Sequence, residues 1–84
     1  MKNLRLNNNE FVLLKEIISL EYTFKKSPNN TYIIQADNLI FDKMLDQLSD
    51  YLVNNCLNDN DELNAIGIDV EKLIDSISEI YYED

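Results

Sequence analysis

The stretch that decides the fold is residues 21–37, "EYTFKKSPNNTYIIQAD". Tyr22 and Phe24 alternate with other residues before "SPNN", and Tyr32 and Ile34 alternate in the same way after it. A period of two is typical of a β-strand with one buried face. In "SPNN" the proline suits the second position of a β-turn, and either asparagine tolerates left-handed backbone geometry. These residues therefore predict a β-hairpin.

Upstream of the hairpin the apolar residues change to helical spacing, from Phe11 to Ile18. The asparagines of residues 7–9 offer N-cap side chains, and Glu10 suits the positive end of a helix. We therefore predict a first helix over about residues 9–20. Before it, the alternation in "LRL" leaves a short N-terminal strand as an option beside the hairpin.

Downstream of the hairpin, Asp37 or Asn38 is placed to cap a second helix that begins to end at Asn54 and Asn55. The apolar face of this helix recurs every three or four residues. Its members are Phe41, Met44, Leu45, Leu48, Tyr51 and Leu52, with Cys56 as a further candidate.

A third helix is predicted near the C-terminus, and its start has two alternatives. A longer helix begins near Asn64 and holds Gly67 in its first turn, whereas a shorter one begins at Asp69. Ile66 keeps the apolar phase of the longer helix, so we favour that start although an internal glycine costs about 1 kcal/mol relative to alanine. The predicted apolar face comprises Ile66, Val70, Leu73, Ile74, Ile77 and Tyr81.

These elements predict one small α+β domain over residues 1–84, with three helices and a hairpin. A chain of 84 residues buries a limited share of its surface, so the core has to be small. The predicted core residues are Phe11, Leu14, Ile18, Ile34, Phe41, Leu45, Leu48, Leu52, Val70, Leu73, Ile74 and Ile77.

The composition removes several kinds of catalytic site. The chain contains no histidine, which excludes Ser-His-Asp and Cys-His catalytic arrangements and the usual zinc sites. Cys56 is the sole cysteine, so no intramolecular disulfide forms. We predict a protein that is not an enzyme. The N-terminus has no apolar signal core and no apolar run approaches the length of a membrane span, which predicts a cytoplasmic protein.

Charge is distributed unevenly along the chain. Residues 1–36 hold five basic and three acidic residues, a net charge of +2, whereas residues 37–84 hold two basic and thirteen acidic residues, a net charge of −11. An acidic surface repels nucleic acid and anionic membranes and attracts basic proteins. The sequence therefore predicts a basic protein partner, with no nucleic-acid and no membrane partner.

The acids of the second and third predicted helices recur every four residues, which places them along one side of each helix. One interpretation is that these acids form an ordinary solvated surface that keeps the protein soluble. Because such a surface would mix charge signs, we favour the alternative, a surface for a cationic partner. Tyr82 lies out of phase with the apolar face and is the preferred aromatic anchor, ahead of Tyr81, Tyr51 and Tyr32. The predicted partner-binding residues are Asp42, Asp46, Asp50, Glu71, Asp75, Glu79 and Tyr82, and Glu83 extends the second acidic series.

The acidic stretch "NDNDELNAIGID" of residues 58–69 does not fit a calcium loop. When the EF-hand register begins at Asp59, Leu63 falls at the fifth position, and when it begins at Asn58, Leu63 falls at the glycine position. We therefore predict no metal site and no cofactor.

Residues 38–78 show one family resemblance. A Leu/Asp-rich helix at residues 45–52, a polar loop at 59–62, Gly67 and "EKLID" at 71–75 resemble small acidic bacterial immunity proteins of polymorphic-toxin and contact-dependent inhibition systems. The resemblance implies a protein that neutralises a toxin domain, often a basic nuclease, by covering its active site. It implies no catalytic residue.

Two other functions remain open on the sequence. A phage-type nucleic-acid mimic that inhibits a DNA-binding defence protein would use the same acidic surface. A small structural or regulatory subunit would instead self-associate through an apolar patch. The sequence leaves open whether the chain forms a homodimer.

Overall fold

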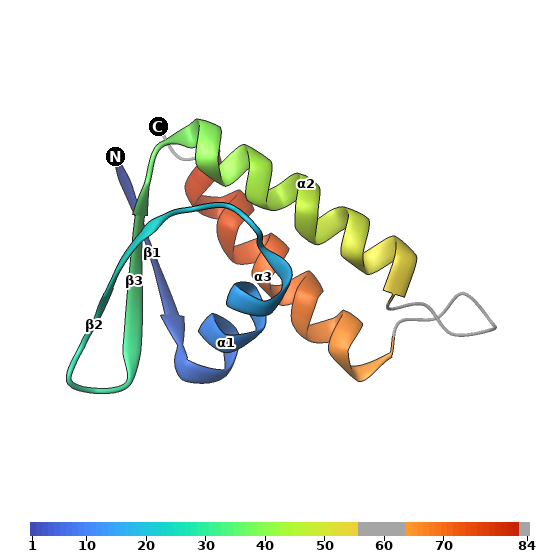
Figure 1. Cartoon of the computed structure of the whole chain (residues 1–84), viewed down its shortest axis with the longest axis horizontal. Coiled ribbons are helices and arrows are strands. Elements are labelled where there is room, and N and C mark those ends of the chain that lie inside the picture. The colour runs from blue at the N-terminus through green and yellow to red at the C-terminus, as the bar shows by residue number, and fades with distance from the viewer. Residues whose placement is uncertain (56–63, 83–84) are drawn as a thin grey trace.

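The predicted hairpin forms, and the N-terminal strand completes a three-stranded antiparallel sheet beside it (Figure 1). The computed structural model describes residues 1–55 and 64–82. Over these residues the chain folds as an α+β domain with three helices, as predicted. The elements in chain order are β1 (Lys2–Asn7), α1 (Asn8–Ile17), β2 (Thr23–Lys26), β3 (Thr31–Ala36), α2 (Asn38–Asn55) and α3 (Ala65–Tyr81).

The strand order is β1-β3-β2, so β3 is central and the other two strands are edges. Leu4, Ile34 and Phe24 form one row across the sheet, and their neighbours Arg5, Ile33 and Lys25 form the next. Successive side chains of a strand point to opposite faces. The Leu4 row therefore faces the helices, and the Arg5 row lies on the outer face of the sheet.

The hairpin turn follows its predicted chemistry. The backbone N–H of Ser27 donates to the carbonyl of Thr31 at 2.7 Å, which closes the turn. Asn30 has φ 58°, in the left-handed region that asparagine tolerates better than most residues.

The start of α1 is capped as its asparagine run predicts. Asn7 Oδ1 accepts the N–H of Glu10 at 2.8 Å, and Glu10 Oε1 accepts the N–H of Asn7 at 2.9 Å. This reciprocal pair is a capping box, which satisfies two backbone donors of the first turn.

The end of α1 differs from the prediction, because the helix stops at Ile17 and not at Leu20. Ile18 is extended at φ −83° and ψ 126°, and its side chain is buried. The next N–H, that of Ser19, donates to Gln47 Oε1 of α2 at 2.9 Å. The side chain of Gln47 therefore replaces the backbone carbonyl that would have accepted this N–H if α1 had continued.

The two long helices start close to the predicted positions. Asp37 Oδ1 accepts the N–H of Ile40 at 3.0 Å at the start of α2. Asn64 Oδ1 accepts the N–H of Gly67 at 2.8 Å, so α3 has the longer of its two predicted starts. Gly67 is buried in this first turn. The predicted inward position of Ile66 is wrong, because this side chain is 49% exposed. It lies at the end of the helix pair, where Ile66 and Leu13 both line a hollow of about 300 Å³.

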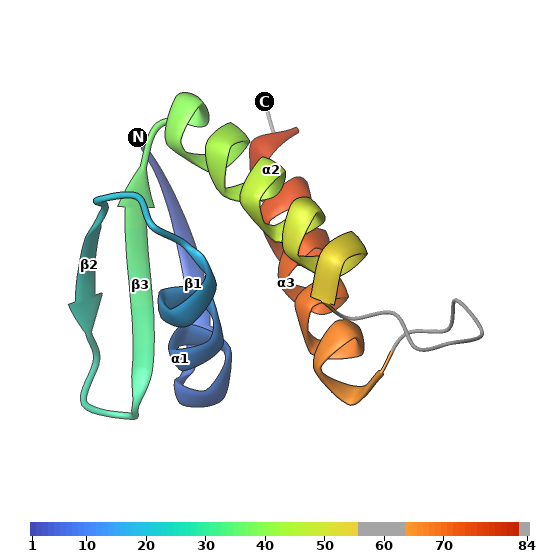
Figure 2. The same ribbon diagram turned by 45° about the vertical axis from the view of Figure 1, so that its right-hand side comes forward.

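All three helices lie on one side of the sheet, and α2 and α3 run antiparallel along each other (Figures 1 and 2). Nine of the twelve predicted core residues are buried, and Leu45, Leu52 and Ile74 are half-buried against them. The buried set also includes Leu4, Leu6, Ala36 and Met44. Cys56, assigned to the second helix on the sequence, lies outside the described residues. None of the described helices has the length and apolar character needed to cross a lipid bilayer.

Candidate partner-binding surface

The outward side of the α2–α3 pair carries the six predicted acidic residues. The apolar sides of both helices pack into the core, with Leu48 of α2 and Leu73 of α3 fully buried. Because the acids are out of phase with these core positions, they lie on the opposite side of each helix. The exposed acids are Asp42, Asp46 and Asp50 of α2, and Glu71, Asp75 and Glu79 of α3.

Each acidic series winds around its helix. An α-helix has 3.6 residues per turn, so a step of four residues advances each side chain by about 40°. Asp42 is therefore turned by roughly 80° relative to Asp50. The predicted surface is consequently divided, with Asp42 near the end of α3 and Asp50 at the rim of a hollow between α2 and the end of α1.

The C-terminal end of α3 lies near Asp42 and Asp46, the first two acids of α2. The negative charge of Asp42 is the main cause that raises the pKa of the Tyr81 phenol, followed by partial burial. The charge of Asp46 adds a smaller contribution to the raised pKa of Tyr81. The phenol of Tyr81 in the last turn of α3 therefore lies in the field of the first two acids of α2.

Tyr82 stands against this tyrosine on the outside of the molecule. The two rings pack edge to face, with 4.9 Å between centroids and an interplanar angle of 88°. The Tyr82 side chain is 76% exposed, as its predicted role as an anchor requires. Its backbone N–H donates to Ser78 O at 3.0 Å, so the backbone of this aromatic residue is held by the helix.

Lys2 fixes the same end of α3 to the sheet. Its Nζ donates to the carbonyl oxygens of Ile80 at 2.8 Å and Tyr81 at 3.2 Å. The last carbonyls of a helix lack intrahelical donors and carry partial negative charge, so an ammonium group suits them. We name the group of Asp42, Asp46, Tyr81 and Tyr82, held by Lys2, the tyrosine corner.

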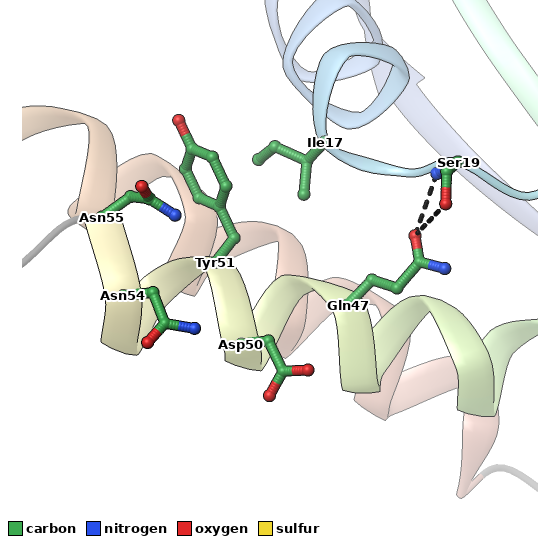
Figure 3. A pocket seen from close by; sticks show the side chains of 7 residues that line it. All are labelled: Ile17, Ser19, Gln47, Asp50, Tyr51, Asn54 and Asn55. Carbon is green, nitrogen blue, oxygen red and sulfur yellow. Dashed lines mark hydrogen bonds between the residues drawn. The ribbon is translucent and has the colours of Figure 1, made fainter.

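Asp50, the last of the three acids of α2, borders a hollow of about 380 Å³ between α2 and the end of α1 (Figure 3). Gln47 reaches across to Ser19, and Tyr51 rises toward Ile17, while Asp50 points the other way (Figure 3). The hollow is open and its remaining lining is amide side chains, those of Asn54 and Asn55. Asp50 is therefore surrounded by polar side chains and does not belong to the tyrosine corner.

The remaining tyrosine candidates are less available to a partner than Tyr82. Tyr32 stacks on Phe11 at 4.0 Å between ring centroids, under the helix layer, and Tyr51 is half-buried. Sequence reasoning missed the contributions of Lys2 and of the Tyr81 phenol. The position of Tyr81 at the end of an apolar helix phase predicts packing, but no signal in the sequence pairs it with Asp42 or pairs Lys2 with α3.

The described part of the chain offers little for metal or acid–base chemistry. In residues 1–55 and 64–82, no group of three or more His, Cys, Asp or Glu side chains is arranged to hold a metal ion. Within the same ranges no polar or charged residue is buried. Residues 59–62 of the rejected calcium loop, and Glu83, lie outside the described residues. What the arrangement can do is attract and contact cationic groups.

Comparison with known proteins found no match: no family model, curated protein or solved structure is similar to this chain.

Proposed function

We propose that the chain is a non-enzymatic acidic binding protein that neutralises a basic toxin domain, such as a nuclease, by covering its active site. The observation that supports it is the tyrosine corner, where the ring of Tyr82, which is 76% exposed, packs on Tyr81, and the phenol of Tyr81 lies in the field of the carboxylates of Asp42 and Asp46. Nuclease active sites bind phosphate and are therefore cationic. A carboxylate surface attracts such a site over long range and speeds association.

The division of the acidic surface assigns different roles to its parts. Asp42 and Asp46 lie near Tyr81, on which Tyr82 packs, and we assign them with Tyr82 to the centre of the contact. Asp50, Glu71, Asp75 and Glu79 are exposed elsewhere along the two helices, and we assign them mainly to steering. Central aromatic residues govern dissociation in protein complexes, whereas rim charges govern association rate and its salt dependence.

Co-expression tests the function directly. A basic toxin domain encoded beside the gene for this chain is expressed in cells with and without the chain, and growth is scored. We expect growth only when the chain is present. If the cells do not grow, and no basic protein is retained by the immobilised chain at low salt, the proposal fails.

Two pairs of variants then locate the binding surface. Asp42→Asn with Asp46→Asn removes two charges from the tyrosine corner, and Glu16→Gln with Glu21→Gln removes two exposed charges from the N-terminal half. The first pair should weaken binding by at least about tenfold, equivalent to about 1.4 kcal/mol. The second pair should have a much smaller effect. Equal effects would show that net charge alone matters and would exclude the corner as the contact.

Tyr82 is tested against its own conservative variant. Tyr82→Ala should speed dissociation by about tenfold or more, while Tyr82→Phe keeps the ring and should remain close to wild type. A retained protein that duplex DNA displaces, and that has no toxic activity, would instead support a nucleic-acid mimic.

A further inference from the structure

The strand β2 forms an edge of the sheet that nothing in the described structure covers. It pairs with β3 on one side only, and all four of its residues are exposed. Edge strands present unpaired backbone groups, and a second polypeptide segment can pair with them.

The turn fixes which backbone groups of β2 point outward. In an antiparallel ladder, residues alternate between positions that exchange hydrogen bonds and positions that do not. Ser27 bonds to Thr31, so Lys25 and Thr23 bond to their own partners in β3. The N–H and C=O groups of Phe24 and Lys26 therefore point away from the sheet, toward an added strand.

A hollow with a mixed apolar and charged lining lies beside the Phe24 part of this edge. Its volume is about 400 Å³, and the ring of Phe24, which is 43% exposed, forms part of its wall. Phe24 is held by Phe11, with ring centroids 4.8 Å apart. The hollow is lined by Lys15, Ile18, Leu20, Glu21, Tyr22 and Phe24.

The charge of this edge is opposite to that of the molecule as a whole. β2 and β3 contain no acidic residue, while Lys25 and Lys26 project from the two faces of β2. Lys26 Nζ lies 6.0 Å from the centre of the Tyr32 ring, and Lys25 neighbours Ile33 on the outer face. In a chain with net charge −9, these lysines favour an acidic segment at this edge.

We propose that the free edge of β2 is a second docking site, which takes an extended polypeptide segment with acidic side chains opposite Lys25 and Lys26 and an apolar side chain toward the hollow at Phe24. A second copy of this chain fits less well, because pairing through the same edge would bring four lysines together. The site lies on the sheet, away from the acidic helices, and does not depend on the proposed function.

A short capped peptide containing Glu-Glu-Leu-Thr is the probe. In antiparallel pairing these residues fall opposite Lys26, Lys25, Phe24 and Thr23 in turn. The control peptide has both glutamates replaced by lysine. Amide hydrogen exchange of the full chain is followed by NMR with each peptide. We expect the acidic peptide to slow exchange at Phe24 and Lys26 by at least about tenfold, because added hydrogen bonds protect amides, and the control peptide to leave it unchanged.

Two variants of Lys26 separate charge from backbone pairing. Lys26→Gln removes the charge and keeps the outward N–H, whereas Lys26→Pro removes both. Proline is tolerated on an edge strand where its missing N–H would face solvent. We expect the proline variant to bind the acidic peptide about fivefold more weakly than the glutamine variant, as the loss of one hydrogen bond predicts.

Four results would overturn the proposal. Unchanged exchange at Phe24 and Lys26 with peptide at millimolar concentration would show that the lysines only protect the edge from pairing. Equal binding of both peptides would show that the lysines do not select an acidic segment, and equal affinity of the two variants would show that strand pairing is not involved. Protection that rises with protein concentration and without peptide would identify a second copy as the occupant.

Discussion

Replacing Lys2 by methionine tests the link between the N-terminal strand and the tyrosine corner. The substitution keeps an apolar stem of similar length and removes the ammonium that donates to Ile80 O and Tyr81 O. Without it, the last carbonyls of α3 depend on solvent. The end of α3, and with it Tyr82, should then become less ordered.

The expected magnitude follows from the two hydrogen bonds. A hydrogen bond that involves a charged group contributes about 1.5–3 kcal/mol, and a cation at a helix C-terminus contributes about 0.3–1 kcal/mol. Lys2 is only partly buried and gives up side-chain freedom to form these contacts, so the lower values apply. We expect a loss of about 1–2 kcal/mol in the free energy of unfolding, which lowers Tm by roughly 5–15 °C for a chain of this size.

Thermal and denaturant unfolding measure this loss, with Lys25→Met as the matched control. The control removes the same charge from an exposed strand position and should change the free energy of unfolding by less than about 0.5 kcal/mol. Amide exchange at Tyr82, whose N–H bonds to Ser78 O, should become faster in Lys2→Met only. If the two variants agree within about 0.3 kcal/mol and exchange at Tyr82 is unchanged, Lys2 does not hold the helix end.

Three further measurements test the core, the tyrosine corner and a helix cap. Leu73→Ala, at a fully buried position, should lower the free energy of unfolding by about 2–5 kcal/mol in a denaturant titration, whereas Leu39→Ala, at a side chain 60% exposed, should change it little. The raised pKa of Tyr81 means that the folded state holds this proton more tightly than the unfolded chain, so its stabilising contribution is present below pH 10.0 and is lost as pH rises through the folded pKa. In Asp42→Asn an absorbance titration of the phenols should show the pKa of Tyr81 moving down toward its ordinary value, and an unmoved titration would contradict the contact. Asn64→Ala should cost about 0.5–2 kcal/mol in the same denaturant titration, because the Gly67 N–H loses its acceptor, and no loss would show that solvent replaces the cap.

The segregation of charge gives the molecule two unlike surfaces. The outward side of α2 and α3 carries acids, and the outer face and β2 edge of the sheet carry Arg5, Lys25 and Lys26 without an acidic residue in β2 or β3. Salt should weaken the binding of a cationic partner to the helices and the binding of an acidic segment to β2 alike. Salt dependence alone therefore does not identify which site is occupied. The variants at Asp42 and at Lys26 do distinguish the two surfaces.

The sequence by itself determined the features that depend on neighbouring residues. The alternation around "SPNN" predicts the hairpin, and short polar side chains at Asn7 and Asp37 predict where the first two helices begin. The 3.6-residue period of α3 places Leu73 inside and Tyr82 outside. These signals act over a few residues, so they do not depend on how the elements pack.

The tertiary structure decided the features that depend on residues far apart in the chain. α1 ends early where the N–H of Ser19 donates to Gln47, a residue 28 positions away in the chain. Ile66 is in phase with the apolar face of α3, but it is exposed because it lies at the end of the helix pair. Lys2 meets a carbonyl 78 residues away. The four-residue spacing predicts one acidic side for each helix, yet packing alone sets Asp42 against Tyr81 and leaves Asp50 beside α1. A period fixes the direction of a side chain about its own helix axis, and the partner it meets is fixed only when the helices, strands and their ends are packed together.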